Sequence, residues 1–359
     1  MPAAFWRDRQ VFVTGHTGFK GGWLSLWLEA LGARVTGYSL DPPTNPSLFE
    51  LAQVGSGIRS IIADIRDSAR LVSAIADADP EVIFHLAAQP LVRASYDSPV
   101  ETFMTNVLGT VHLLEAARAC RSVKSIVVVT SDKCYENREW VWPYRENEAM
   151  GGYDPYSASK GCAELATTAY RRSFFLGQDG GERVGIGSAR AGNVIGGGDW
   201  AVDRLVPDIV RSAAQRKPVR IRNPRAVRPW QHVLEPLWGY LILAEKLAVD
   251  PRSASGGWNF GPWDSDTQPV EWVTRTIVDL WGDGASWELD EGHQVHEAHL
   301  LKLDSSKARA GLGWQPRLNL AEALAWTVNW YKAHAAARNM RAETLKQIRQ
   351  YEDLTHNDQ

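Results

Sequence analysis

The sequence has few cysteines, no long hydrophobic run and no excess of one charge. Its three cysteines among 359 residues lack the spacing of a zinc site and are odd in number, so neither a metal centre nor a disulfide framework is indicated. No apolar run approaches the roughly 20 residues that span a bilayer, and residues 1–10 are too few and too polar for a signal peptide, so we expect a cytoplasmic protein. Lys and Arg (39) nearly balance Asp and Glu (42), which excludes the broad positive field of a nucleic-acid-binding protein.

The sequence does have the composition of a globular protein, with 44% hydrophobic and 23% charged residues. At roughly 150 residues per domain, its length allows two domains. Short β-branched runs alternate with longer helical patterns, which predicts an α/β fold: a doubly wound parallel sheet of the Rossmann type with helices on both faces. The predicted strands are residues 11–13, 35–38, 61–63, 82–85, 126–130 and 184–189, and the predicted helices are residues 22–31, 68–77, 99–119 and 157–176.

Beyond residue 190 the chain becomes rich in Gly, Pro and Trp, as in Gly196-Gly197-Gly198-Asp199-Trp200. This texture predicts pocket-forming loops rather than more regular sheet. We therefore expect a dinucleotide-binding domain at 1–190, to which 226–262 returns, and a smaller substrate-binding lobe interleaved with it. The lobe is predicted to comprise 191–225 and 263–334, followed by a peripheral helix and frayed tail at 335–359.

The first predicted strand runs into a glycine-rich turn that opens a helix. Glycines permit a tight turn and close backbone approach, while a helix N-terminus offers free N–H groups to a diphosphate. The turn therefore predicts a dinucleotide site that is formed by Gly15, Thr17, Gly18, Phe19, Lys20 and Gly21.

Carboxylates after the next strands are candidates for the rest of the dinucleotide. An acidic residue is expected about 20 positions beyond the turn to bind a ribose hydroxyl. Asp41 lies just past the second strand, whose end carries Ser39, and no Arg follows immediately to hold a 2′-phosphate, which favours NAD over NADP. Asp64 follows the third strand and is compatible either with an adenine contact or with capping a helix.

A second group of polar residues predicts proton-transfer chemistry. Tyr156 and Lys160 are spaced to share one face of a helix, where a lysine lowers the pKa of a neighbouring phenol toward neutrality. The strand 126–130 ends at Ser131, Asp132 and Lys133, at the carboxyl edge where ligands of such folds bind. We expect these side chains to converge on Tyr156.

These motifs together resemble the extended short-chain dehydrogenases/reductases that act on nucleotide sugars. The similarity runs from Thr14-Gly15-x-x-Gly18-Phe19-x-Gly21 through His85-Leu86-Ala87-Ala88-Gln89, Asn106-Val107-x-Gly109-Thr110 and Tyr156-x-x-x-Lys160 to Leu312-Gly313-Trp314-x-Pro316. Within that superfamily, the first turn, Thr130-Ser131-Asp132-Lys133-Cys134-Tyr135 and Arg228-Pro229-Trp230-Gln231-His232-Val233 are similar to the CDP-glucose 4,6-dehydratase group. The resemblance implies NAD as cofactor, with further contacts from Ile65, Leu86, Ala87, Ala88, Gln89, Asn106, Tyr156 and Lys160.

The implied reaction is an internal redox dehydration of CDP-glucose to CDP-4-keto-6-deoxy-D-glucose. Tyr156, helped by Lys160, takes the proton of the C4 hydroxyl while hydride passes to NAD, and Ser131 bonds the same oxygen. Asp132 and Lys133 then supply the acid and the base for loss of water across C5 and C6, followed by return of hydride to C6. Which of the two is the acid stays open, and Lys133 could instead form a salt bridge that merely orients Asp132.

The resemblance also implies substrate contacts and partners. Arg228 and Asn193 match positions that bind the sugar diphosphate, whereas Arg220 and Arg222 are weaker candidates. His85 is expected to pack at a strand end, and three histidines spaced by three residues are expected to cover surface rather than hold a metal: His293, His296 and His299. Family members are commonly homodimers through helices such as 99–119 and 157–176, and their products are expected to supply deoxysugars for bacterial surface polysaccharide, including lipopolysaccharide O-antigen.

Two other functions remain compatible with the sequence. One is a dehydratase for another nucleotide sugar or a 4-epimerase, although an epimerase has no need of the Asp132-Lys133 pair. The other is a non-catalytic dinucleotide-binding scaffold, which would have no chemical reason to keep Ser131, Tyr156 and Lys160 together. The fold alone does not separate these alternatives.

Overall fold

A seven-stranded parallel sheet forms the centre of the computed structural model, which describes residues 3–176, 184–290 and 300–356. The strand order is β10-β6-β5-β4-β1-β2-β3, so the chain builds outward from β1 on one side and then from β4 on the other. Ligands of such sheets bind at the carboxyl ends of the strands where the order reverses, here between β1 and β4. The strands are β1 Gln10–Thr14, β2 Arg34–Ser39, β3 Arg59–Ile62, β4 Val82–His85, β5 Ser125–Val129, β6 Gly185–Ala191 and β10 Gly256–Phe260.

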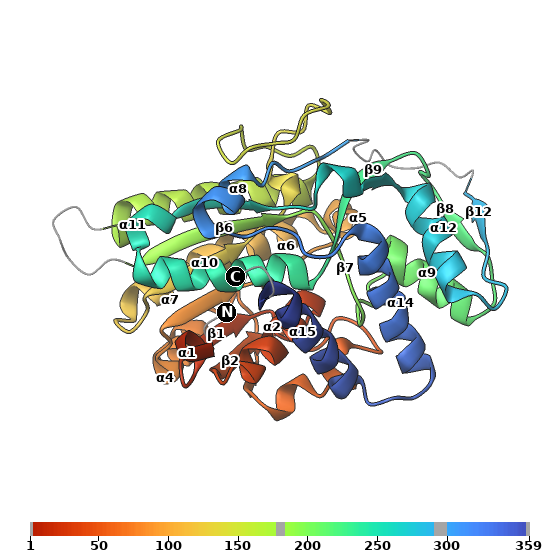
Figure 1. The fold of residues 1–359 in the computed structure, drawn as a ribbon. Helices are drawn as coiled ribbons and strands as arrows, with labels where there is room; N and C mark the ends of the chain where they lie inside the picture. The colour runs from red at the N-terminus through yellow and green to blue at the C-terminus, as the bar shows by residue number, and fades with distance from the viewer. Residues whose placement is uncertain (1–2, 177–183, 291–299, 357–359) are drawn as a thin grey trace.

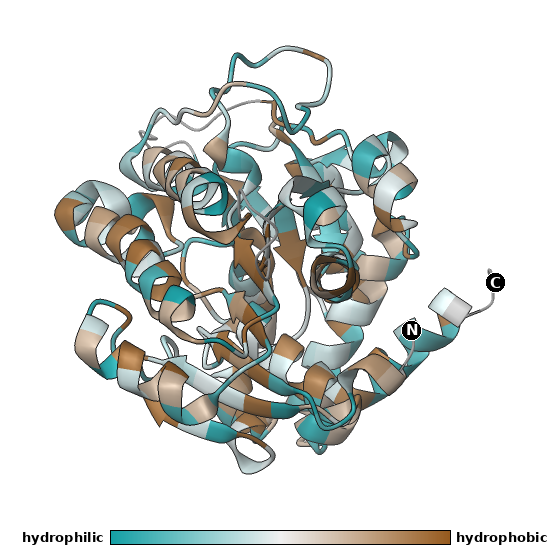
Figure 2. Cartoon of the chain, turned by 90° about the vertical axis from the view of Figure 1, so that its left-hand side faces the viewer, coloured by the Kyte–Doolittle hydropathy of each residue, from teal (hydrophilic) through white to brown (hydrophobic). Residues whose placement is uncertain are grey.

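Helices cover both faces of this sheet, as Figure 1 shows. Alternate residues of β1 explain the two layers, because Phe12 packs into one buried hydrophobic cluster while Val11 and Val13 pack into the other. Figure 2 shows hydrophobic residues concentrated on the central strands. The main covering helices are α2 Phe19–Ala30, α4 Ser68–Ala78, α7 Gly109–Ala119, α8 Pro155–Tyr170 and α10 Leu234–Val249. The predicted Rossmann-type fold is therefore confirmed.

Two predicted helices contain π-helical stretches that the sequence does not reveal. The segment predicted as one helix at 99–119 comprises α6 Pro99–Phe103, a π-helical stretch Met104–Leu108 and then α7. In the same way, α8 continues into a π-helical stretch at Arg171–Phe175. A change from i+4 to i+5 hydrogen bonding leaves the apolar periodicity nearly intact, which is why the pattern predicted continuous helices.

The second half of the chain adds two small sheets beside the main one. The three-stranded sheet has the order β11-β9-β7, and the two-stranded sheet pairs β12 with β8. The expectation of loops rather than regular sheet is therefore wrong for this region, because four of the five strands have only three residues, too few for a detectable alternation. The bounds are β7 Asn193–Ile195, β8 Val219–Ile221, β9 Val227–His232, β11 Thr267–Pro269, β12 Trp287–Leu289, α9 Leu205–Ala214, α12 Val270–Trp281 and α14 Leu320–Ala335.

The C-terminal helix α15, Met340–His356, lies against α2, near both ends of the chain in Figure 1. Trp27 of α2 donates its Nε1 hydrogen to Glu352 Oε1 at 2.8 Å, and its ring packs edge-on against Tyr351. The sequence predicts a peripheral helix and a frayed tail over 335–359; the structure has the helix, which buried aromatic contacts order up to residue 356. The remaining helical segments are α1 Ala3–Trp6, α3 Leu48–Leu51, η1 Val54–Ser56, α5 Val92–Asp97, η3 Asp132–Cys134, α11 Pro251–Ala254, η5 Asp264–Asp266 and α13 Ser306–Leu312.

Within the described ranges, none of the helices combines the length and the hydropathy that crossing a bilayer requires.

Candidate active site

The glycine-rich turn forms a compact cradle between β1 and α2. Gly15 has a φ of +79°, and a Cβ atom on it would lie 2.8 Å from the backbone nitrogen of Ala87. The helix begins at Phe19, three residues earlier than predicted. A Cβ atom on Gly21, in the first turn, would lie 2.0 Å from the carbonyl oxygen of Gly15, so only glycine fits there. Gly18 provides no side-chain cap, which leaves the N-terminal N–H groups of α2 for an anion. The cradle thus fits a dinucleotide diphosphate.

The end of β2 is tied to this turn by hydroxyl groups. Thr17 Oγ1 donates to the carbonyl oxygen of Leu40 at 2.9 Å and lies 2.8 Å from Ser39 Oγ. Asp41, the candidate for the ribose, is exposed and forms no hydrogen bond or ion pair within the described residues. Its ribose contact stays a prediction, while Thr17 and Ser39 already have partners in the protein.

Asp64 is held by its own neighbour. Arg66 Nη2 lies 2.6 Å from Asp64 Oδ2, and the Arg66 backbone nitrogen donates to Oδ1 at 2.8 Å. The side-chain hydrogen bond from Arg66 lowers the pKa of Asp64. Asp67, not Asp64, caps the next helix, since its side chain accepts from the Arg70 backbone at 3.0 Å. The helix-capping alternative for Asp64 is therefore wrong, and its carboxylate closes a turn instead.

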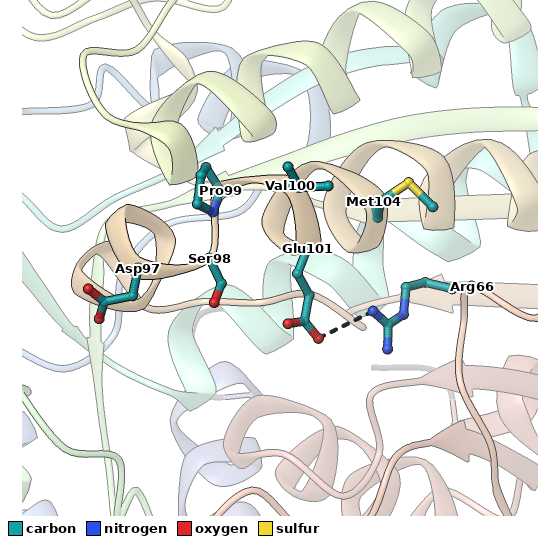
Figure 3. Close-up of a pocket in the computed structure, with 7 residues that line it drawn as sticks. All are labelled: Arg66, Asp97, Ser98, Pro99, Val100, Glu101 and Met104. Carbon is teal, nitrogen blue, oxygen red and sulfur yellow. Dashed lines mark hydrogen bonds and ion pairs between the residues drawn. The ribbon is translucent and has the colours of Figure 1, made fainter.

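A surface pocket of about 490 Å³ opens beside this turn. Figure 3 shows Arg66 reaching from one wall to Glu101 of α6 on the other, at 3.2 Å. Its lining consists of Arg66, Asp97, Ser98, Pro99, Val100, Glu101 and Met104. The pocket lies outside the group of catalytic candidates described below.

The predicted cofactor residues after β4 form a loop held by two buried side chains. Thr14 Oγ1 accepts from the backbone nitrogens of Leu86 and Ala87, each at 3.1 Å. Asn106 accepts from the Gln89 backbone at 2.8 Å and donates to Ser159 Oγ at 2.8 Å. The Asn106 amide therefore joins this loop, which includes Ala88, to α8.

His85 at the end of β4 is a packed side chain, as expected. Its ring nitrogens lie 2.8 Å from Thr14 Oγ1 and 3.0 Å from Thr110 Oγ1. Burial lowers the pKa of His85 to about 3, so the ring is neutral and structural.

Ser131, Asp132 and Lys133 form a tight turn at the carboxyl end of β5. Ser131 caps η3 and donates through Oγ to Asp132 Oδ1 at 2.9 Å. Asp132 is 2% exposed, and its Oδ2 has no hydrogen-bond partner in the described part of the chain. Burial raises the pKa of Asp132, while the charge of Lys133 and the bond from Ser131 oppose the rise. Within the same ranges, Lys133 forms no ion pair with Asp132, so the orienting salt bridge is absent.

Tyr156 and Lys160 lie in the first two turns of α8, facing this turn. Burial raises the pKa of Tyr156 to about 12, opposed by a hydrogen bond with Ser131. Lys160 Nζ donates to the carbonyl oxygen of Val129 at 3.4 Å, and burial lowers the pKa of Lys160 to about 8. The expectation that Lys160 brings the pKa of Tyr156 toward neutrality is not met in this geometry, because burial outweighs the nearby positive charges.

Two charged residues of this site, Arg204 and its partner Asp199, are not among the residues predicted from the sequence. Arg204 precedes α9 and is held by Asp199, whose Oδ2 lies 2.8 Å from Arg204 Nη1. The charge of Arg204 lowers the pKa of both Tyr156 and Lys20. No motif marks Arg204, although it follows the Gly-Gly-Gly segment that was expected to form a pocket.

Lys20 belongs to the phosphate-binding turn but also acts on the catalytic turn. Its charge opposes the rise in the pKa of Asp132. Burial and the neighbouring cations Arg204 and Lys160 lower the pKa of Lys20 to about 8. Through Lys20, the phosphate-binding turn therefore acts on Asp132, the candidate acid of the catalytic turn.

The candidate substrate residues fall into two groups. Arg228 of β9 is 7% exposed and its charge also lowers the pKa of Asp132, while Asn193 begins the neighbouring strand β7. Arg220 is exposed and paired with Glu288 at 2.8 Å, and Arg222 is paired with Asp203 at 3.2 Å. Arg228 therefore lies near the catalytic turn, whereas Arg220 and Arg222 form ion pairs elsewhere.

Among the described residues there is no group of three or more His, Cys, Asp or Glu side chains that could hold a metal ion. His293, His296 and His299 lie outside the described residues.

Comparison with known proteins gives consistent relatives. The family model for GDP-mannose 4,6 dehydratase matches residues 12–251. The CDP-glucose 4,6-dehydratase of Salmonella typhimurium is 56% identical over 352 residues, 98% of each chain. The dTDP-glucose 4,6-dehydratase of Streptomyces antibioticus is 30% identical over 91% of this chain and 93% of its own. The solved structure of a dTDP-glucose 4,6-dehydratase double mutant from Streptomyces venezuelae, with NAD bound, matches with a TM-score of 0.76 and 22% identity over 92% of this chain and 99% of that one.

Proposed function

The chain belongs to the GDP-mannose 4,6-dehydratase family, and from that membership we propose that it is an NAD-dependent CDP-glucose 4,6-dehydratase. The proposed product is CDP-4-keto-6-deoxy-D-glucose. The substrate follows from the relative that shares 56% of its residues over nearly the whole length and is named a CDP-glucose 4,6-dehydratase.

One observation carries the reaction type. The buried Asp132, whose pKa is raised, accepts a hydrogen bond from Ser131, and Ser131 also acts to lower the pKa of Tyr156. A carboxyl group with a raised pKa is suited to protonate a leaving hydroxyl, and a phenol near it is suited to exchange a proton with a second hydroxyl of the same sugar. The proton transfers at the C4 and C6 hydroxyls therefore each have a group within one site, and Lys133 on the same turn is the candidate for the C5 proton.

The roles of the side chains follow from this arrangement. Tyr156 takes the proton of the C4 hydroxyl, and Ser131 orients that oxygen. Lys133, free of an ion pair with Asp132 in the described part of the chain, removes the C5 proton. Asp132 donates its proton to the C6 hydroxyl, which leaves as water, and a proton returns to C5 when hydride returns to C6. Arg228 binds the substrate diphosphate from β9, with Asn193 beside it on β7.

Bound NAD would accept the hydride from C4 and later donate it to C6. The residues that fit it are the cradle of Gly15, Gly18 and Gly21 at the N-terminus of α2. Asp41, Asp64 and the loop 86–89 flank this cradle and are proposed to hold the adenosine half. The similar dTDP-glucose 4,6-dehydratase holds NAD in its solved structure.

The experiment that tests the proposal is a substrate panel. Purified protein with NAD is incubated separately with CDP-, dTDP-, GDP- and UDP-glucose, and each product is assayed for the alkali-induced ultraviolet absorbance of a 4-keto-6-deoxy sugar. We expect a signal with CDP-glucose, lost in Tyr156→Phe. A signal with a different nucleotide would correct the substrate, and silence with all four by a protein that binds NAD would overturn the dehydratase.

A homodimer is part of the same proposal. Large apolar side chains are exposed along α6, α8 and the π-helical stretches that follow each of them, including Val100 at 75%, Leu165 at 60% and Phe174 at 51%. These helices are the ones expected to form the interface, and a second copy would cover them. Sedimentation is expected to show a dimer that Leu165→Glu dissociates, whereas Leu289→Glu, at another exposed leucine, leaves it intact. A monomeric wild-type protein would contradict the dimer.

The proposed location is the cytoplasm. Cys120, Cys134 and Cys162 are all free, as is usual for proteins of a reducing compartment.

A further inference from the structure

A buried ion pair lies directly behind the catalytic residues. Glu164 of α8 and Arg190 of β6 are 3% and 5% exposed, and they meet through two parallel hydrogen bonds of 2.8 Å. Glu164 lies one turn beyond Lys160 and two turns beyond Tyr156, so the three side chains share one face of the helix. The pair therefore fixes the helix that carries the phenol and the amine against the main sheet.

The Glu164 carboxylate also holds the strand before the catalytic turn. Thr130 Oγ1 donates to Oε1 at 2.5 Å, and Ser188 Oγ donates to Oε2 at 2.6 Å. Together with Arg190, four hydrogen bonds reach the two oxygens, which compensates for burying the charge. Arg190 keeps the pKa of Glu164 below its ordinary value despite burial. Thr130 immediately precedes Ser131, so the first end of the turn is anchored.

Arg190 holds the other end of the same turn. Its Nη1 donates to the Tyr135 hydroxyl at 2.6 Å and to the Glu146 carbonyl at 3.1 Å, and the guanidinium lies over the Tyr135 ring. The Tyr135 hydroxyl passes its own hydrogen to Asn259 Oδ1 at 2.7 Å. Tyr135 directly follows Cys134, the last residue of η3. One ion pair thus clamps both flanks of Ser131–Cys134.

We propose that Glu164 and Arg190 are positioning residues for the elimination step of the reaction proposed above. The turn that carries Asp132 and Lys133 is only a three-residue helix, and Asp132 Oδ2 has no hydrogen bond of its own in the described residues. Its placement therefore depends on the anchors at Thr130 and Tyr135. Tyr156 and Lys160 lie in a sixteen-residue helix, whose backbone bonds and ion pair remain when the anchors at Thr130 and Tyr135 are lost.

The short turn and the long helix should therefore respond differently when the anchors are lost. Elimination breaks the C5–H and C6–O bonds, and the proton from C5 and the departing water are handled by groups on the clamped turn. Oxidation at C4 relies mainly on Tyr156, and the clamped turn contributes only Ser131, which orients the C4 oxygen. Loosening the clamp is expected to slow loss of water more than oxidation, because misplacing a reacting group by about 1 Å costs up to 100-fold in rate.

Two mild substitutions test the clamp without removing the ion pair. Thr130→Val deletes the hydroxyl that anchors the first flank, and Tyr135→Phe deletes the hydroxyl that anchors the second. Thr167→Val is the matched control, because Thr167 is a buried threonine of α8 whose hydroxyl, among the residues described, bonds only to its own helix at Ala163. All are assayed as NAD-loaded enzyme with CDP-glucose in deuterated water.

Two rates are compared after mixing: the appearance of reduced-cofactor absorbance, which reports oxidation, and its decay together with deuterium incorporation at C5 of the product, which report elimination and the steps that follow it. In Thr130→Val and Tyr135→Phe we expect elimination to fall about tenfold more than oxidation, so that reduced cofactor accumulates. Thr167→Val should keep the wild-type ratio.

Equal loss of both rates, or no loss, would overturn the positioning role while leaving the dehydratase intact. A wild-type protein that turns over no nucleotide sugar would overturn the proposed function, and the positioning role with it. The wild-type measurement therefore separates the two failures.

Discussion

The carboxylate oxygen Oδ2 of Asp132 faces Gly192, where a Cβ atom would lie only 3.1 Å from it. The same Cβ atom would lie 2.5 Å from Cγ of Pro229 in β9. Gly192 joins β6 to β7. Together with Pro229 of β9, it packs against the carboxyl group of Asp132, the proposed acid. This close approach is what buries Oδ2 and raises the pKa of the group.

Gly192→Ala is therefore expected to displace either Asp132 or Pro229 and to lower kcat about tenfold or more, because the proposed acid leaves its position. The measurement is kcat with CDP-glucose together with the melting temperature. Gly239→Ala in α10 is the matched control, since its Cβ atom would lie 2.3 Å from the ring of Phe260 in β10, away from the acid. It should lower the melting temperature and keep the kcat of the folded enzyme. Wild-type kcat in Gly192→Ala would contradict the packing argument.

The main sheet was predictable because its signals are local. Each strand is a short apolar run, and the alternation of Phe12 with Val11 and Val13 reflects burial on two faces. The glycine-rich turn was predictable because crowding at Gly21 and positive φ at Gly15 leave no alternative residue. The small sheets and the order of the C-terminal helix were missed, because they depend on contacts between distant segments, such as Trp27 with Tyr351.

The sequence predicts which residues are the catalytic candidates, but not which residues of other segments surround them. The sequence brings Ser131, Asp132 and Tyr156 to one place through strand order and helix spacing, and their hydrogen bonds follow that expectation. It does not reveal the residues that surround them from other segments. Arg204 and Arg190 carry no motif, and their importance comes from the charges they meet after folding.

Lys20→Met is expected to raise the pKa of Asp132 further, because the Lys20 cation favours the ionised carboxylate. If Asp132 acts as an acid, the alkaline limb of the elimination rate moves to higher pH in this variant. Lys20→Arg keeps the charge and should keep the limb in place. The pH profile of deuterium incorporation at C5 measures the shift, and NAD affinity is recorded alongside. A large loss of NAD affinity with an unchanged profile would instead assign Lys20 to the cofactor alone.

Arg204→Met is expected to raise the pKa of Tyr156 above its present value of about 12, because a cation that favours the phenolate is lost. Oxidation that depends on the phenolate then shifts to higher pH. The rate of C4 oxidation against pH measures this shift, and Arg204→Lys serves as the charge-preserving control. Because Arg204 also pairs with Asp199, Asp199→Asn is tested as well and should leave the Tyr156 limb closer to that of the wild type. Identical profiles in Arg204→Met and the wild type would rule out this electrostatic role.

Glu235 predicts a pH dependence of stability that is separate from catalysis. Its carboxyl group is fully buried at the start of α10, where it accepts from the Leu318 backbone at 2.7 Å and from the Tyr351 hydroxyl at 2.6 Å. Burial raises its pKa to about 7, whereas a glutamate in the unfolded chain titrates near about 4.3. Between these values the folded state holds a proton that the unfolded state has released.

The stabilisation from this group is consequently complete below about pH 4 and is lost as the pH rises to about 7, with a magnitude on the order of 3 kcal/mol. Urea unfolding at several pH values between these limits gives the free energy of unfolding of the wild type and of Glu235→Gln, which cannot ionise. The wild type should lose stability relative to Glu235→Gln as the pH rises, while buried histidines such as His85 act in the opposite sense in both proteins. Glu288→Gln at an exposed ion pair should keep the wild-type slope. The same slope in Glu235→Gln and the wild type would place the origin of the pH dependence in another group.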